Sequence, residues 1–128
     1  MRDYQPKKSK YILPKPVWHR TLWLIRDHDR LQSEADQLVT ITSRPSDTPG
    51  GRRGTHSDPV ANAAIKRERF LKDVEVIDKT LERIPKEYRA GVWQWIQGGT
   101  YPLDADRVTY SRWKSKYIYD VAAEMGYI

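Results

Sequence analysis

The sequence predicts an all-α protein in which a long antiparallel helical hairpin is followed by a C-terminal pair of shorter helices. Apolar residues recur at three- and four-residue steps through each of the four long segments. Prolines stand where the first three of these segments begin, and glycines stand where the two C-terminal segments end. A stretch rich in glycine, proline, serine and threonine separates the two longest segments. Together these signals place four helices and one long loop.

The first long helix is expected from about Pro16 to Leu38. One stripe contains Trp18, Leu22 and Ile25, and a second repeats leucine every seven residues at Leu24, Leu31 and Leu38. Such a helix carries more apolar surface than one neighbour can cover. It therefore packs on two neighbours of the same chain, or on a second copy of the protein in a homo-oligomer.

The second long helix is expected to begin at Asp58-Pro59, an N-cap followed by a proline at the first helical position, and to run to about Arg83. Its apolar residues form a coiled-coil-like stripe: Ala63, Phe70, Val74, Ile77, Leu81 and Ile84. Paired with the first helix, it makes a hairpin over residues 16–83 with a flexible loop at 40–57.

Residues 84–128 have the outline of a helix-turn-helix module. Its first helix follows Ile84-Pro85 and stops at Gly98-Gly99, and its second runs from an N-cap at Thr109 to Gly126. The connection of about ten residues contains Pro102 and a segment able to form a single helical turn. Helix, tight connection and helix is the arrangement by which many proteins place their second helix in the major groove of DNA.

The last helix has two different sides at 100° per residue. The core side contains Tyr117, Ile118, Val121 and Met125, flanked by Trp113 and Ala122. The opposite side is polar and basic near its start, as a helix that contacts DNA through its N-terminal half requires. The expected DNA-binding residues of this helix are Thr109, Ser111, Arg112, Ser115, Lys116 and Tyr119.

The positive charge of the chain is concentrated at its N-terminus. The formal net charge of the 128 residues is +6, and residues 1–15 carry Arg2, Lys7, Lys8, Lys10 and Lys15 against the single acid Asp3. We expect a flexible basic arm there. Either it is a solvated tail, or it lies along phosphates and adds Lys7, Lys8 and Lys10 to the DNA-binding residues.

Other function classes have little support in the sequence. It has no cysteine, nucleophile–base pair or carboxylate cluster, so we expect no enzyme, no cofactor and no metal site. Asp27-His28-Asp29 does not alter this, because consecutive helical residues point in different directions. No apolar run is long enough to span a membrane and the N-terminus lacks an apolar signal core, so we expect a protein of the bacterial cytoplasm without a membrane partner.

The order of the segments resembles a known family. The stretches YILPKPVWHRTLWLIRDHDRL, SDPVANAAIKRERFLKDVEVIDKTLERIP, IPKEYRAGVWQWIQGG and VTYSRWKSKYIYDVAAEMGYI are similar to those of the RinA/ArpU-type phage transcriptional activators, whose C-terminal module resembles region 4 of bacterial sigma factors. The resemblance covers roughly residues 11–128. It implies a sequence-specific, double-stranded DNA-binding activator of phage or prophage genes that reads the major groove with its last helix and assists the host RNA polymerase.

Two alternatives stay open at this point. The first is the small DNA-recognition subunit of a phage packaging terminase, which is also helical, basic and coiled-coil-bearing. The second is a helical interaction module that binds another protein and does not bind DNA. A ring-shaped oligomer favours the terminase subunit, and a lack of affinity for any duplex at low salt favours the interaction module.

Overall fold

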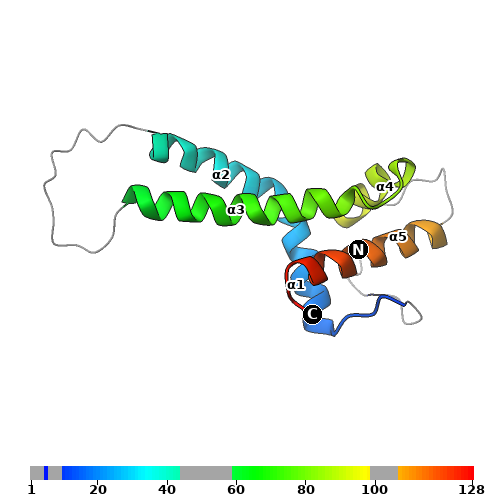
Figure 1. Ribbon diagram of the computed structural model, residues 1–128. Helices are drawn as coiled ribbons and strands as arrows, with labels where there is room; N and C mark the ends of the chain where they lie inside the picture. Colours follow the sequence, from blue (N-terminus) through cyan, green and yellow to red (C-terminus); the bar gives the residue numbers. More distant parts are fainter. Residues whose placement is uncertain (1–4, 6–9, 44–58, 99–106) are drawn as a thin grey trace, which may run out of the picture. The chain divides into compact units, whose positions relative to one another are not determined.

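The computed structural model describes residues 5, 10–43, 59–98 and 107–128; for residues 40–43 it describes the backbone only. In this part of the chain all regular structure is helical, which confirms the all-α prediction (Figure 1). None of the helices there is both long and apolar enough to cross a membrane. The helices are α1 (Lys15–Arg26), α2 (His28–Ser43), α3 (Pro59–Leu81), α4 (Lys86–Ile96) and α5 (Arg107–Glu124).

The helix boundaries follow the proline and glycine signals closely. Pro16 lies in the first turn of α1, Pro59 is the first residue of α3, and Pro85 is the N-cap residue of α4. Proline is tolerated at these positions because the first N–H groups of a helix have no partner within the helix. Gly98, two residues after the end of α4, has φ +108°. The predicted stop at this glycine is confirmed.

The end of α5 is a Schellman motif centred on Gly126. The N–H of Gly126 donates to the carbonyl of Ala123 at 3.1 Å, and the N–H of Tyr127 donates to that of Ala122 at 2.8 Å. This pattern requires a left-handed residue, and Gly126 has φ +77°. The glycine therefore ends α5 as the sequence predicted.

The first long helix is not continuous, contrary to the expectation for residues 16–38. It is divided at Asp27, whose N–H is shared between the carbonyls of Trp23 (3.0 Å) and Leu24 (3.1 Å). The end of α1 is held by α4, because Gln97 Nε2 donates to the carbonyl of Ile25 at 2.9 Å. In return, Arg26 Nε donates to the carbonyl of Ile96 at 2.7 Å. The apolar periodicity of one segment gives no information on such contacts, because they join residues about seventy positions apart in the chain.

The chain forms two compact units. Residues 1–28 and 75–128 make unit 1, and residues 29–74 make unit 2. The first helix of the chain therefore lies in the same unit as the last two. All residues of the main core belong to unit 1: Leu13, Trp18, Leu22, Ile25, Ile77, Ile84, Val92, Ile96, Tyr110, Tyr117, Ile118, Val121 and Ala122.

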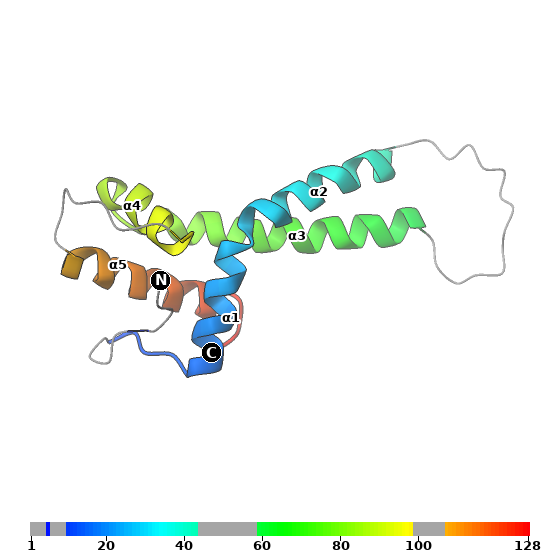
Figure 2. The same cartoon turned by 180° about the vertical axis from the view of Figure 1, so that it is seen from behind.

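Within unit 1, α5 packs against both α1 and α4. Figures 1 and 2 show α4 beside the N-terminal half of α5 and α1 crossing its C-terminal half. Tyr88 of α4 meets Tyr110 edge to face at 5.5 Å and stacks on Trp113 at 6.3 Å between ring centroids. Such pairs add to the free energy of burying the rings. The two neighbouring helices therefore hold α5 along most of its length.

A buried hydrogen bond joins α5 to the last turns of α3. The Tyr117 hydroxyl donates to the carbonyl of Ile77 at 3.0 Å. Burial raises the pKa of Tyr117 far above its ordinary value, and the negative charge of Asp78 raises it further. Tyr117 is thus a neutral donor at any physiological pH. Its predicted core position is confirmed.

The N-terminal segment before α1 is partly packed on unit 1. Leu13 is buried, and its N–H donates to Gln5 Oε1 at 2.9 Å while Gln5 Nε2 donates to its carbonyl. The rings of Tyr11 and Tyr119 lie 5.4 Å apart. The prediction that the flexible arm extends through residue 15 is therefore wrong for Tyr11 and Leu13. An apolar side chain that reaches the core fixes the backbone around it.

Unit 2 contains α2 from residue 29 and α3 up to residue 74, which lie side by side in both views (Figures 1 and 2). Among its described side chains, those of Leu31, Ala35, Ala63 and Val74 are buried. Two of these four are alanines, so little apolar area is removed from water. The core of this unit is much smaller than that of unit 1.

Candidate nucleic-acid interface

The basic and polar residues singled out by the sequence lie on α5, which begins earlier than expected. Its first residue is Arg107, so Thr109 lies in the first turn, half-buried, and the predicted N-cap role of Thr109 is wrong. Asp106 directly precedes the helix, and aspartate is a preferred N-cap residue type. The earlier start adds Val108, which is exposed, to the helix. Asp106 was the signal in the sequence that could have indicated this boundary.

The buried side of α5 is wider than the predicted stripe. Ser115, expected among the DNA-facing residues, is only 2% exposed, and Lys114 is buried beside it. The ammonium of Lys114 lies 4.4 Å from the ring centroid of Trp95, a cation–π contact with α4. Because α5 packs on two helices, residues at the edge of its apolar stripe are covered as well. Ser115 is therefore not on a surface that DNA can reach.

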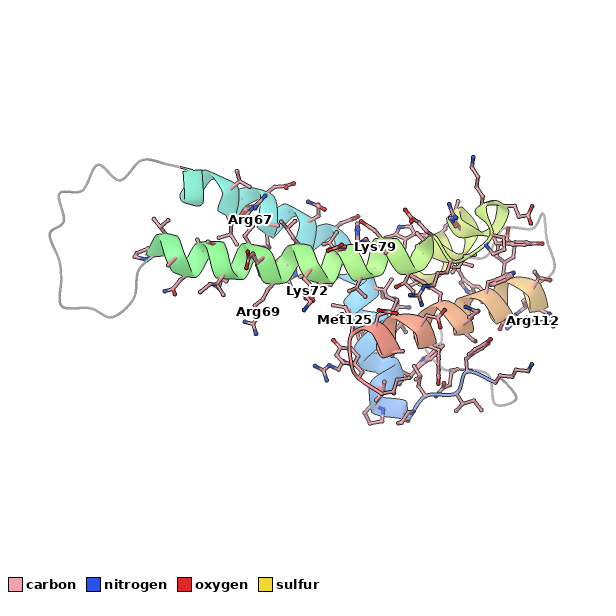
Figure 3. All side chains as sticks on the ribbon, in the orientation of Figure 1. Arg67, Arg69, Lys72, Lys79, Arg112 and Met125 are labelled. Atoms are coloured by element: carbon pink, nitrogen blue, oxygen red, sulfur yellow. The ribbon has the colours of Figure 1, made fainter. Side chains whose placement is uncertain are left out.

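Arg112, like Arg107, is an exposed basic residue of α5. It makes no hydrogen bond or ion pair within the part of the chain that the structure describes. Figure 3 shows its side chain near the N-terminal end of α5. On a helical wheel it stands opposite Tyr110, Tyr117 and Val121, which are buried. The guanidinium thus projects from the side of α5 that faces away from the core.

The acidic residues of the same helix are compensated by neighbouring cations. Lys116 Nζ lies 2.7 Å from Asp120 Oδ2, four residues on along the helix. Arg83 pairs with Glu124 at 2.8 Å, and this hydrogen bond raises the pKa of the Arg83 guanidinium. The half of α5 that contains Arg112 therefore keeps its positive charge, and Lys116 is partly engaged before any partner binds.

The remaining predicted residues are less well placed for contact. Ser111 and Tyr119 are half-buried, and the ring of Tyr119 is covered in part by Tyr11. Lys10 is exposed, in the segment next to Tyr11. Lys7 and Lys8 lie outside the described residues. The structure thus brings Lys10 and Tyr119 into one neighbourhood through the contact between the two tyrosine rings.

The exposed side of α5 has the chemistry for contact with duplex DNA. An arginine presents five N–H donors in a planar fork that fits the O6 and N7 acceptors of guanine, and a valine side chain can contact a thymine methyl group. Among the described residues no three potential metal ligands lie together. No protein-family model, curated protein or solved structure matches this chain.

Proposed function

We propose that the protein is a sequence-specific double-stranded DNA-binding activator of phage or prophage transcription that acts in the bacterial cytoplasm. The observation that carries this proposal is the exposure of Arg112 opposite the buried side of α5, with no hydrogen bond or ion pair to the residues that the structure describes. A surface arginine whose guanidinium is not engaged by the described residues is suited to an external acceptor. Val108 and Lys116 flank it on the same side of the helix.

In this proposal α4, the connection over residues 97–106 and α5 form the helix-turn-helix, and α5 enters the major groove. The contacts of Tyr88 with Tyr110 and Trp113 support it, because the first helix of such a motif braces the second near its N-terminal end. The hairpin is formed by α2 and α3. Assistance to the host RNA polymerase follows from the family resemblance, and we propose the polymerase as the second partner.

Fluorescence anisotropy with labelled duplex and single-stranded oligonucleotides of random sequence tests the DNA-binding part. We expect the duplex to bind at low salt, with log K falling linearly as log salt concentration rises. A preference for the single strand would indicate binding through aromatic stacking instead. No binding of either form at low salt would contradict the proposal and favour the interaction module.

A charge-removing variant of the N-terminal segment tests its role on the duplex. Replacing Lys7, Lys8 and Lys10 together by alanine keeps Gln5, whose amide holds Leu13, so the packed part of the segment stays in place. Each lysine that contacts a phosphate contributes about 0.9 to the slope of log K against log salt concentration. We expect a shallower slope with an unchanged preferred sequence. An unchanged slope would mean that these lysines are a solvated tail.

A further inference from the structure

We propose that the exposed side of α1 docks an acidic segment of a protein partner, with Trp23 as the apolar anchor. Trp23 is 59% exposed, whereas Trp18 and Ile25 on the opposite side of α1 are buried in the core of unit 1. A tryptophan ring brings a large apolar area to an interface when a partner covers it. Tryptophan is also enriched among the residues that dominate the free energy of protein–protein binding.

Trp23 belongs to a continuous group of aromatic and arginine side chains. The guanidinium of Arg26 lies over the Trp23 ring, 5.0 Å from its centroid. Arg20 stands one turn before Trp23 on the same side of α1, and its guanidinium lies 3.8 Å from the centroid of the Tyr127 ring. Ile128, next to Tyr127, is 50% exposed. We call Arg20, Trp23, Arg26 and Tyr127 the α1 patch, and its three residue types are those enriched at the centres of protein interfaces.

The charge of the α1 patch favours an acidic partner. The sequence of α1 contains Lys15, Arg20 and Arg26 and no acid, and residues 4–26 as a whole contain none. The first acid that follows, Asp27, is half-buried. Arg20 makes no hydrogen bond or ion pair with the described residues, so its N–H donors can reach a carboxylate of the partner. Complementary charge of this kind sets the choice of partner and the rate of association.

Nucleic acid, the other common anionic partner, fits the α1 patch less well. Single strands stack successive bases on open aromatic rings. Here the Arg20 guanidinium lies over Tyr127 and the Arg26 guanidinium lies over Trp23, so the patch does not offer two open rings in succession. Duplex DNA presents phosphates, which give the Trp23 ring no apolar contact. An acidic protein segment with an exposed aliphatic or aromatic side chain fits both the ring and the guanidinium groups.

The α1 patch is separate from the DNA-binding residues proposed on α5. Within unit 1, α1 crosses the C-terminal half of α5, whereas Arg112 lies near its N-terminal end (Figures 1 and 3). A protein partner can therefore occupy α1 while α5 contacts a duplex. In the proposed activator this partner is a surface of the host RNA polymerase, and only that identification rests on the proposed function.

Selection from a library of random peptides tests which chemistry the α1 patch binds. We expect the wild type to enrich peptides that combine aspartate or glutamate with leucine or phenylalanine, and Trp23→Ala not to enrich them. Fluorescence anisotropy then measures the dissociation constant of an enriched peptide. We expect it to rise about 30-fold for Trp23→Ala, the loss of an interface anchor, and about tenfold for Arg20→Gln. Both side chains are exposed, so circular dichroism should show each variant folded.

Two residues of α3 provide matched controls. Ile65 is 59% exposed, as Trp23 is, and Arg69 is an exposed arginine, but both lie in unit 2. Ile65→Ala and Arg69→Gln should leave peptide binding unchanged. A library that stays random, or peptides that Trp23→Ala retains as well as Ile65→Ala does, would overturn the proposal. Weaker binding of Trp23→Ala to single-stranded or duplex DNA would assign the patch to nucleic acid and overturn it too. The peptide measurements need no DNA, so the proposed function can fail while this proposal stands.

Discussion

Replacing Trp18 by alanine should lower the free energy of unfolding by about 3–5 kcal/mol, as the loss of a large buried aromatic side chain does. Trp18 is 2% exposed in the core of unit 1, next to Leu22 and Ile25 on the buried side of α1. Its indole N–H has no hydrogen-bond partner among the described residues. The ring therefore contributes through apolar packing, and Trp18→Phe should lose much less than Trp18→Ala.

The control for Trp18 is Trp23, five residues on in the same helix. Trp23 is 59% exposed and touches the guanidinium of Arg26 at 5.0 Å. Trp23→Ala should cost less than about 1 kcal/mol, the value of an exposed cation–π contact. Urea denaturation followed by circular dichroism measures both. Similar losses for Trp18→Ala and Trp23→Ala would show that α1 does not belong to the core of unit 1.

Replacing Arg112 by alanine should weaken binding to the preferred duplex by about 1–3 kcal/mol, as the loss of a bidentate arginine–guanine contact does. The effect on a random duplex should be much smaller, because the contact reads a base edge. Arg112 is exposed and makes no hydrogen bond or ion pair with the described part of the chain, so the variant should unfold at the same urea concentration. Equal losses on both duplexes would remove the base-reading role of Arg112.

Lys116 is the matched comparison on the next turn of α5. Lys116→Ala should weaken binding to the preferred and the random duplex alike, because in the proposed complex this lysine contacts a phosphate. Part of the loss comes from Asp120, which the substitution leaves without its ion-pair partner at 2.7 Å. The double variant Lys116→Ala, Asp120→Asn separates the two contributions. Selective loss on the preferred duplex alone would assign base reading to Lys116 as well.

The sequence predicted the helices and several of their ends, because those depend on local chemistry. Pro16, Pro59, Gly98 and Gly126 act through the backbone of their own segment, and each stands where the sequence placed a boundary. The break at Asp27 was missed, since nothing in its neighbourhood resembles a stop signal. It is held by hydrogen bonds to α4, which lies about seventy residues away in the chain.

The candidate site was predicted only in part, because the sequence pattern gives side-chain directions within a helix but not the contacts between helices. Periodicity placed Arg112 opposite Tyr117 and Val121 on α5, and the burial of these two core residues agrees. It placed Ser115 with Arg112, but the packing of α5 on both α1 and α4 covers Ser115. A helical wheel gives the direction of a side chain. The number of helices that cover it is set by the tertiary fold.

Sequencing of the duplexes retained from a random-sequence library by the wild type and by Arg112→Ala tests the central claim most directly. If the exposed side of α5 reads the major groove, the wild type should enrich one motif that contains a strongly preferred guanine. Arg112→Ala should enrich the same motif with that position relaxed. A library that stays random with the wild type, or a guanine preference that Arg112→Ala leaves intact, would contradict the reading of DNA by α5.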